Sequence, residues 1–479
     1  MRPVLYQKLN TLMTTTKLRD AWHLFKRAIA GDSEINYTEG SIARVTLLLA
    51  IPMILEMAME SVFAIVDIFF VAKLGTDAVA SVGLTEAVIT LLYALAIGLS
   101  MGATAMVARR VGENNPDAAS IVAGQVIWLG VFVSVAVGLT GLFFAREILQ
   151  LMGAEDSVVE TGVGYTRLMI GGCFSIVFLF LINAIFRGAG DATIAMRALW
   201  LANGINIVLD PCLIYGFWIF PELGVTGAAV ATNFGRSVGA LYGLYHLIGN
   251  RGRLRLGQQE IALRLKIVWL LVQISAGGVA QFLVATASWV FLMSIVSGFG
   301  SDAVAGYTIA VRVVMFSILP AWGLSNAAAT LVGQNLGAGL LARAEITTWR
   351  IAKYNASYMA IAAIAMLVFD EQIARLFTRE SEVLFHAVNC LQIFAYGYVG
   401  WGFGMAVIQA FNGAGDTITP TFINVLCFWI IQVPLAYGLA LPLGWGPTGV
   451  FWAVFVADNL TCVLGVLAFR RGRWKTLVV

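Results

Sequence analysis

Residues 44–72 read RVTLLLAIPMILEMAMESVFAIVDIFFVA, an apolar run that carries only three acidic side chains. The hydrocarbon core of a bilayer is about 30 Å thick, and a helix of about 20 apolar residues is long enough to cross it. Lipid offers no hydrogen-bonding partner to the open edge of a strand, so such a run must be helical. The stretch therefore predicts a membrane-spanning helix, and the same pattern recurs along the chain.

The composition of the whole chain is that of a membrane protein. Hydrophobic residues make up 59% of its 479 residues, charged residues 12%, and the mean hydropathy is +0.85. Soluble domains carry about 25% charged residues, so this surface must face lipid. We expect an all-α membrane protein with twelve transmembrane helices. The apolar runs cover roughly 44–72, 79–108, 117–145, 158–186, 192–216, 224–248, 267–297, 303–336, 343–369, 382–411, 418–441 and 447–470.

Basic residues in the connections predict the orientation of these spans, because Lys and Arg are enriched in cytoplasmic loops. With the N-terminus in the cytoplasm, the cytoplasmic connections hold 19 Lys and Arg and the opposite connections hold 4. We therefore expect a multi-pass protein of the inner (plasma) membrane with both termini in the cytoplasm. In the N-terminal segment, basic residues alternate with apolar ones, which suits either a helix on an anionic membrane surface or a poorly ordered tail.

The two halves of the chain repeat each other at an offset of 225 residues. LGTDAVASVG at 74–83 recurs as FGSDAVAGYT at 299–308, and FRGAGD at 186–191 recurs as FNGAGD at 411–416. Six spans per half make the repeats parallel, related by a pseudo-two-fold axis along the membrane normal. The expected domains are a basic N-terminal segment (1–43), two six-helix lobes (44–248 and 267–470), a cytoplasmic linker (249–266) and a cytoplasmic tail (471–479).

Ionisable side chains inside spans are expensive, so each one is a functional hypothesis. Glu56, Glu60 and Asp67 lie in the first span, within about 40° of one another on one helical face. Pro52, one turn before Glu56, leaves a backbone carbonyl without its helical partner and predicts a bend.

A second polar stripe is predicted in the fifth span, where Asn203, Asn206 and Asp210 share one face. Thr232 lies in the sixth span. At the corresponding positions the second half is apolar or neutral, so the carboxylates are expected in the first half alone. The pairs are Asp67 with Leu292, Asn206 with Ile431, Asp210 with Leu435, Glu60 with Ala285 and Glu56 with Gln281.

This asymmetry favours an ion site over a purely structural role, because helix packing would act on both halves alike. A buried carboxylate can bind and release a proton near physiological pH. Two carboxylates with amide and hydroxyl oxygens can instead hold Na⁺, with Asp67, Asn206, Asp210 and Thr232 as ligands. Glu56 and Glu60 either attract cationic substrates or hydrogen-bond across helices, and both alternatives stay open.

On these residues the sequence resembles the multidrug and toxic compound extrusion (MATE) family, and within it the DinF-type prokaryotic branch. The resemblance covers about residues 44–470. Its motifs are Pro52, Asp67 and Gly75 in their spacing, GLSMGATAMVARRVGE at 98–113, FRGAGD at 186–191, NIVLDP at 206–211 and GAAVAT at 227–232. Each motif is weak alone, but their order within the repeat is specific.

The resemblance implies two six-helix lobes in a V shape and antiport of H⁺ or Na⁺ against organic, often cationic, compounds. It implies a coupling aspartate at Asp67 and a helix that bends at Pro52. It also implies a set of oxygen ligands at Asn206, Asp210, Ala228 and Thr232, and a substrate-pocket residue at Asn183. Glu60 stands where relatives often have Gln, and Glu56 and Glu60, the substrate candidates named above, leave the charge preference for substrate and the proton stoichiometry open. The acids that the NorM-type branch carries in its seventh and tenth helices are missing, so we expect no cation site in the second lobe.

Three competing functions remain at this point. A lipid-linked oligosaccharide flippase of the same superfamily would need several basic residues in its cleft, and the spans hold mainly Arg167, Arg236 and Arg312. A membrane enzyme would need a His or paired-Asp constellation that the spans lack. We expect an exporter that is not an enzyme, needs no cofactor beyond its coupling ion, binds small organic molecules and lipid but no nucleic acid, and works as a monomer.

Overall fold

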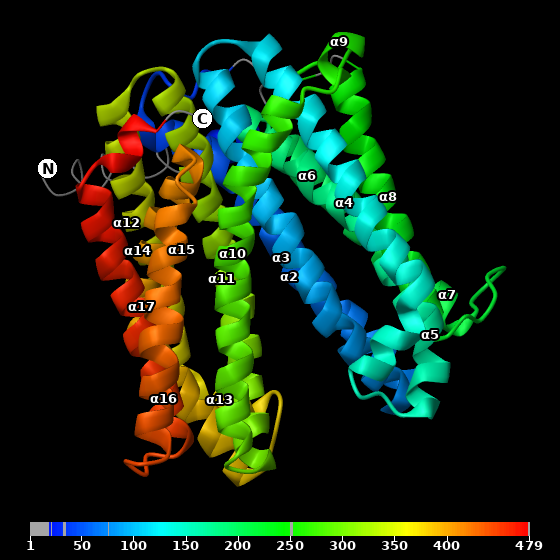
Figure 1. Cartoon of the computed structure of the whole chain (residues 1–479). Coiled ribbons are helices and arrows are strands. Elements are labelled where there is room, and N and C mark those ends of the chain that lie inside the picture. Colours follow the sequence, from blue (N-terminus) through cyan, green and yellow to red (C-terminus); the bar gives the residue numbers. More distant parts are fainter. Residues whose placement is uncertain (1–18, 21, 32–34, 75, 250–251, 478–479) are drawn as a thin grey trace, which may run out of the picture.

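The computed structural model describes residues 19–20, 22–31, 35–74, 76–249 and 252–477, and the described part of the chain is helical, with no strand (Figure 1). The helices form two bundles joined by a linker that carries the short helix α9 (Gln258–Ile261). The first bundle, called the N-lobe, contains α2 (Ile42–Val71), α3 (Thr76–Gly112), α4 (Pro116–Leu151), α5 (Asp156–Gly171), α6 (Phe174–Ala189), α7 (Ala192–Tyr215) and α8 (Val225–Ile248). The second, called the C-lobe, contains α10 (Leu265–Ser297), α11 (Ser301–Gly337), α12 (Leu341–Val368), α13 (Asp370–Arg375), α14 (Ser381–Ala414), α15 (Ile418–Asn424), a π-helix (Val425–Gln432), α16 (Val433–Ala440) and α17 (Pro447–Arg470).

The expected all-α architecture of twelve spans in two bundles is confirmed. Among the described residues, eleven helical segments are long and apolar enough to cross a membrane. The twelfth span is α8, a helix of 24 residues that is more polar than the others because it carries Asn233, Arg236 and His246. Because α8 packs along α7 and α6, its polar side chains face protein rather than lipid.

The fourth expected span, 158–186, is two helices rather than one. The chain breaks between α5 and α6 at Gly172, where a Cβ would lie 2.5 Å from the carbonyl oxygen of Leu168. Asn233 of α8 bridges this break: its Nδ2 donates to the Leu168 carbonyl at 2.8 Å, and its Oδ1 accepts from Ser175 Oγ at 2.6 Å. A break inside a membrane bundle is tolerated because a neighbouring side chain satisfies the freed backbone.

The eleventh expected span, 418–441, is helical throughout but loosens into the π-helix at its centre. Ser288 and Trp429 tie this segment to α10. Ser288 Oγ donates to the carbonyl of Phe428 at 3.3 Å, and the indole N–H of Trp429 donates to the carbonyl of Val284 at 3.0 Å. Short π-segments of this kind change the direction in which the following side chains project.

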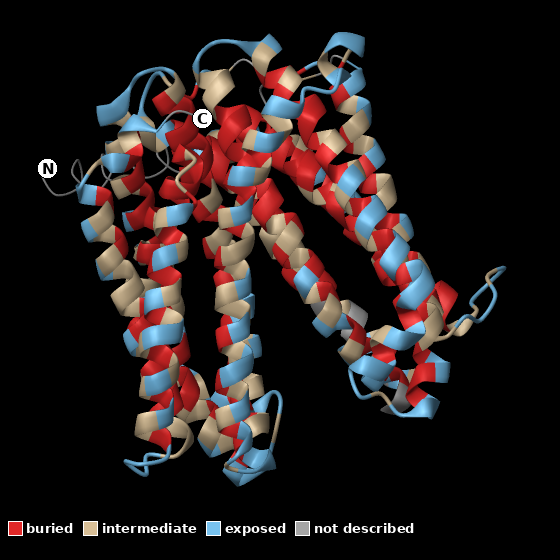
Figure 2. Ribbon diagram, in the orientation of Figure 1, coloured by how far each residue is buried: buried red, intermediate tan, exposed pale blue. Residues whose placement is uncertain are grey.

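The two lobes meet at one end of the molecule and spread apart at the other, so that the molecule has the shape of a V (Figure 1). We call the joined end the closed end and the opposite end the open end. The closed end also holds α9 and the last described residues of the chain, up to Leu477. Buried residues concentrate where the lobes meet at the closed end (Figure 2). The V shape implied by the family resemblance is therefore present.

Paired glycines let the lobes touch at the closed end. A Cβ on Gly112 of α3 would lie 2.0 Å from the carbonyl oxygen of Gln334, and a Cβ on Gly337 of α11 would lie 2.1 Å from that of Arg109. Gly112 corresponds to Gly337 and Arg109 to Gln334 at the offset of 225, so the contact is made twice with the same geometry. The internal repeat thus builds a two-fold seam in which each half supplies the same patch, as in an isologous dimer.

Helix α2 changes partners along its length. Its first half, from Val45 to Met53, belongs to the same apolar cluster as Leu331 and Phe411 of the C-lobe. Beyond Pro52 the helix is hydrogen-bonded to α7 of the N-lobe from the carbonyl of Leu55 to that of Phe70. Pro52 therefore stands where α2 leaves one lobe and joins the other. The helix is continuous from Ile42 to Val71 with Pro52 inside it.

The N-terminal segment runs over the closed end. Residues 22–30 are helical, and Arg197 of α7 holds the end of this helix by donating to the carbonyls of Ile29 and Ala30 at 3.0 and 2.8 Å. Further along, Arg343 of α12 donates to the carbonyls of Gly40 and Glu39 at 3.0 and 2.8 Å. The segment is thus hydrogen-bonded to both lobes.

The C-terminal tail also crosses between the lobes. Trp474 is fully buried against Phe469 of α17, and Lys475 Nζ lies 2.6 Å from Glu345 of α12. At the end of the tail, Arg109 of α3 donates to the carbonyl of Leu477 at 2.8 Å. Both terminal segments therefore hold the closed end together.

Candidate functional site

A buried ion pair joins α2 and α6 inside the N-lobe. Glu56 projects from α2 into the bundle, and its Oε1 lies 2.7 Å from Nη1 of Arg187 at the end of α6. Asn183, one turn earlier on α6, donates to the same oxygen at 3.1 Å. All three side chains are buried, so the pair is shielded from solvent. Removing either partner of such a pair would leave the other charge buried and uncompensated.

The C-lobe holds a neutral copy of this pair. Gln281 stands where Glu56 does and Asn412 where Arg187 does, and Gln281 Nε2 donates to Asn412 Oδ1 at 2.9 Å. Arg187 is a residue that the sequence interpretation counted only as a loop charge. The signal was available, because FRGAGD changes to FNGAGD at the same offset at which glutamate changes to glutamine. The repeat preserved the contact and changed its charge.

The carbonyls at the end of α6 are held by the opposite lobe. Thr330 Oγ1 of α11 donates to the carbonyl of Arg187 at 3.0 Å, and Gln334 Nε2 donates to that of Gly188 at 2.9 Å. These bonds satisfy C-terminal groups that a helix leaves without an internal partner. The Glu56–Arg187 pair is therefore connected to the seam between the lobes.

Glu60 lies one turn beyond Glu56 on α2 and is more exposed, with 22% of its side chain accessible. Asn203 of α7 donates to its Oε2 at 3.0 Å, and Arg236 of α8 lies 4.0 Å from its Oε1. Arg236 also donates to the hydroxyl of Tyr93 at 2.6 Å and lies over the rings of Phe63 and Tyr93. Glu60 thus joins three helices of the N-lobe and keeps part of its side chain accessible.

The expected ligands on α7 and α8 come together. Asn206 Nδ2 donates to Thr232 Oγ1 at 2.9 Å and lies 3.3 Å from Asp210 Oδ1. Asp210 is fully buried, and Ala228 lies one turn from Thr232 on α8 and is also buried. Carboxylate, amide and hydroxyl oxygens therefore lie together between two packed helices. A hard cation is coordinated by oxygens of this kind, and a buried carboxylate can bind a proton.

The position of the Asp67 side chain lies outside the described part of the structure, although its backbone is part of α2. Tyr215 at the end of α7 donates to the carbonyl of Phe70 at 2.6 Å, so this part of α2 is joined to α7. The distance between Asp67 and Asp210 therefore stays untested, as does the sodium site that was predicted to include both.

Two oxygens beside the ion pair are left without a partner among the described residues. They are Oε2 of Glu56 and Oδ1 of Asn183, and both are buried. Both are acceptors, so a group that satisfies them must donate hydrogen bonds: water, an amine or an ammonium ion. The cluster can therefore receive a hydrogen-bond donor without rearranging its ion pair.

The expectation that carboxylates occur in the first half alone is wrong. Asp458 of α17 lies inside the C-lobe with an exposed fraction of only 8%. The comparison at the offset of 225 missed it because the offset has slipped to 222 by this helix, and the corresponding residue of the N-lobe is Arg236.

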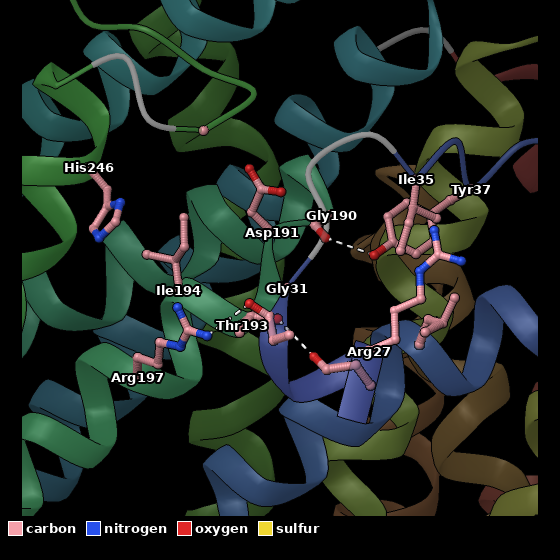
Figure 3. Close-up of a pocket in the computed structure, with 14 residues that line it drawn as sticks. Arg27, Gly31, Ile35, Tyr37, Gly190, Asp191, Thr193, Ile194, Arg197 and His246 are labelled. Carbon is pink, nitrogen blue, oxygen red and sulfur yellow. Dashed lines mark hydrogen bonds between the residues drawn. The ribbon is translucent and has the colours of Figure 1, made fainter. Parts of the chain in front are cut away.

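A small cavity of about 160 Å³ lies at the closed end, between the N-terminal segment and the turn from α6 to α7 (Figure 3). Tyr37 donates to the carbonyl of Gly190 beside it at 3.0 Å. Asp191 lines the cavity, and burial raises the pKa of its carboxyl although the nearby Arg253 acts in the opposite direction. Arg253, which lies 3.5 Å from Asp191, belongs to the linker, so this region fastens the linker to the N-lobe.

Comparisons with known proteins agree with this arrangement. The family model MatE matches residues 52–212 and 279–438, one segment in each lobe. The chain is 27% identical over 438 residues to the probable multidrug resistance protein NorM of Thermotoga maritima, covering 90% of this chain and 93% of that protein. It is 26% identical over 446 residues to the probable multidrug resistance protein YoeA of Bacillus subtilis, covering 91% and 95%. A solved structure described as the outward-facing conformation of a multidrug resistance MATE family transporter of the MOP superfamily superimposes with a TM-score of 0.87 at 27% identity, covering 93% of this chain and 100% of that one.

Proposed function

The chain belongs to the MatE family of membrane transporters, and from that premise we propose that it is a secondary antiporter that exports organic, mainly cationic compounds in exchange for H⁺ or Na⁺. It is a multi-pass membrane protein and not an enzyme. The proposal adds the direction of transport, the coupling ion and the class of substrate. Its placement in the DinF-type branch is part of the proposal and rests on the polar residues of the N-lobe.

The observation that carries the proposal is the buried cluster of Asn206, Asp210 and Thr232 between α7 and α8. At the corresponding positions the C-lobe has Ile431 and Leu435 in place of Asn206 and Asp210. The two lobes have the same helix packing, but the positions that are polar on α7 of the N-lobe are apolar in the C-lobe. A need for stability alone does not explain why one lobe buries a carboxylate where the other has leucine.

Coupling follows from the chemistry of this cluster together with Asp67. When the lobes expose the cluster to the side with more H⁺ or Na⁺, an ion binds to the carboxylates, and when the V reverses the ion leaves on the other side. Each positive charge that moves inward supplies about 2.3 kcal/mol per 100 mV of membrane potential. The oxygens gathered here suit both ions, so the coupling ion is left as H⁺ or Na⁺.

The substrate residues are proposed to be Glu60, Glu56 and Asn183. Glu60 is the accessible carboxylate of the three and attracts positively charged compounds. Deeper in the lobe, the open acceptors Glu56 Oε2 and Asn183 Oδ1 suit the N–H groups of an organic amine. Pro52, where α2 passes from one lobe to the other, is proposed as the hinge through which ion binding changes the path of α2.

The membrane orientation is proposed from two observations. Basic residues are concentrated in the connections that were assigned to the cytoplasm, and the described parts of both terminal segments lie at the closed end. We therefore place the closed end in the cytoplasm and the open end on the outside of the plasma membrane. Because one chain supplies both lobes of the pseudo-two-fold pair, a monomer is proposed as the unit of transport.

The flippase alternative gains no support. Arg236 is engaged by Tyr93 and lies 4.0 Å from Glu60. Arg167 on α5 and Arg312 on α11 are exposed and belong to different lobes. A pyrophosphate group requires converging positive charges, and these three side chains do not form such a group.

The direct test uses purified protein in liposomes loaded with a fluorescent organic cation. We expect an imposed pH gradient or Na⁺ gradient to drive the cation across the membrane against its own gradient. Liposomes with an equal membrane potential but no ion gradient are the control. Transport that is the same with and without both ion gradients would refute antiport.

A further inference from the structure

Asp458 occupies the middle of a membrane-spanning helix and has no role in the coupling site proposed above. It is the twelfth of the 24 residues of α17. At 1.5 Å per residue it lies about 17 Å from either end of the helix, close to the centre of the bilayer. Its exposed fraction is 8%. Carboxyl groups at this depth are rare and are found where protons or ions move.

The carboxyl has no partner in the part of the chain that the structure describes. Among the described residues, no Lys, Arg or His forms an ion pair with it, and no side chain donates a hydrogen bond to it. The nearest polar side chains on its own helix use their donors elsewhere: Asn459 Nδ2 donates to the carbonyl of Phe455 at 2.8 Å, and Thr461 Oγ1 donates to that of Ala457 at 2.9 Å. An ionised carboxylate at this depth would have no counter-charge and, with an exposed fraction of 8%, little solvation, so the neutral form is the one that fits.

The position of the N-lobe that corresponds to Asp458 carries a charged side chain with partners. Arg236 of α8, which corresponds to Asp458 at the local offset of 222, donates to Tyr93 at 2.6 Å and lies 4.0 Å from Glu60. Asp458 has the opposite sign and no such partners. Packing of the sixth helix therefore does not demand a carboxyl here.

The groups of the neighbouring helices that lie within electrostatic range of Asp458 are phenols and a thiol. Asp458 interacts electrostatically with Tyr307 of α11, Tyr398 of α14 and Cys427 of the π-helix. The hydroxyl of Tyr398 shares a hydrogen bond with Ser317 at 2.9 Å. None of these groups carries a positive charge.

Tyr307 is a donor that lacks an acceptor. Its ring is 1% exposed and stacks on Phe451 with centroids 5.9 Å apart, while its hydroxyl has no hydrogen-bond partner among the described residues. Phe451 lies seven residues, or two helical turns, before Asp458, so the Tyr307 ring packs on the face of α17 that carries this carboxyl. Because buried hydroxyls are almost always hydrogen-bonded, the unpaired hydroxyl on this face indicates a second arrangement of the same groups. In that arrangement the Tyr307 hydroxyl donates to the ionised carboxylate.

We propose that Asp458 is a second proton-binding site, located in the C-lobe and separate from the cluster on α7 and α8. In the V-shaped conformation the carboxyl holds a proton and is neutral. When the lobes reverse and Tyr307 or water reaches Asp458, the proton leaves and the carboxylate carries one negative charge. Among the described residues, no group of three or more His, Cys, Asp or Glu side chains that could hold a metal ion lies here, so the ligand in this proposal is a proton. Its part in transport rests on the proposed antiport; its binding of a proton does not.

The experiment is infrared difference spectroscopy on protein in liposomes, recorded while the pH is raised. A protonated aspartic acid absorbs through its C=O stretch, and ¹³C-labelling of aspartate shifts that band and assigns it. We expect the wild-type protein to lose such a band as the pH rises and Asp458→Asn to lack it from the start. Asp302→Asn, which removes an exposed carboxyl at the start of α11, is the matched control and should leave the band in place. Tyr307→Phe keeps the stacked ring and should move the loss of the band to higher pH.

Transport supplies the second measurement. The number of protons that cross per substrate molecule should fall by one in Asp458→Asn and stay unchanged in Asp302→Asn. A wild-type spectrum identical to that of Asp458→Asn would overturn the proposal, because the carboxyl would then be ionised throughout. A band that Asp458→Asn removes but that never responds to pH would also overturn it, because the acid would be permanently neutral. If the band titrates but no gradient drives export, the proton site stands and the antiport proposal fails.

Discussion

Glu56 and Arg187 form a buried ion pair at 2.7 Å, and the internal repeat has replaced both residues together by Gln281 and Asn412, which hydrogen-bond at 2.9 Å. The same contact between the first helix and the end of the fourth span is thus charged in one lobe and neutral in the other. Since the neutral version holds an equivalent helix pair, the charge in the N-lobe is not needed for packing. This comparison within one molecule supplies matched variants for the first prediction.

Glu56→Gln and Arg187→Asn, made singly, are expected to destabilise the protein, because each leaves the opposite charge buried without its partner. Breaking a buried pair in this way typically costs about 3–5 kcal/mol. Thermal unfolding of the purified protein in detergent measures the loss.

The double variant Glu56→Gln with Arg187→Asn recreates the pair found in the C-lobe and should recover most of the lost stability. Its transport of organic cations should still be weaker than that of the wild type, since Glu56 is gone. A loss of stability in the double variant that equals or exceeds the sum of the losses in the two single variants would show that the neutral pair cannot replace the charged pair in the N-lobe.

Asp67→Asn is expected to insert and fold normally but to lose export driven by an ion gradient. The amide keeps the shape of the side chain and cannot bind or release a proton, and it is a poor substitute for a carboxylate towards Na⁺. The measurement is gradient-driven transport in liposomes at matched protein content. Efflux equal to that of the wild type would reject Asp67 as a coupling group.

Glu60→Gln should weaken export of cations more than export of neutral compounds. Part of this carboxylate is accessible, and its attraction for a cation disappears with its charge, whereas Asn203 can still hydrogen-bond to the amide. Transport rates of a cationic compound and an uncharged compound of similar size are compared in one preparation. An equal reduction for both would remove the electrostatic role.

Gly112→Ala should open the seam at the closed end. The added methyl group would lie 2.0 Å from the carbonyl oxygen of Gln334, so α3 and α11 must move apart, and overpacking of this kind costs about 1–3 kcal/mol. Spin labels at the exposed positions 117 and 338 report the distance between the lobes, which should lengthen.

Gly83→Ala is the control for this change, because it lies in the same helix and a methyl group there meets nothing within 4 Å. It should leave the distance unchanged, and because alanine favours a helix over glycine it should not lower the stability. Identical label distances in wild type and Gly112→Ala would show that the seam tolerates a side chain.

The amino-acid pattern alone was sufficient for the fold. Apolar runs of about 20 residues leave the chain no option but membrane helices. The offset that pairs Gly112 with Gly337 was visible before any coordinates, and the seam follows from it because both glycines are needed for the same close approach. The grouping of Asn206, Asp210 and Thr232 was also expected, since helical spacing places two of them on one face of α7.

What the sequence could not supply is which buried charges meet. Arg187 was assigned to a loop because it stands at the very end of its helix, yet the fold turns it inward onto Glu56. Asp458 escaped notice because the offset slips before α17, and its isolation could be seen only when every neighbouring helix was in place. Hydropathy and spacing are properties of one segment, whereas the partner of a buried charge is set by contacts between segments far apart in the chain, and these exist only in the folded lobes.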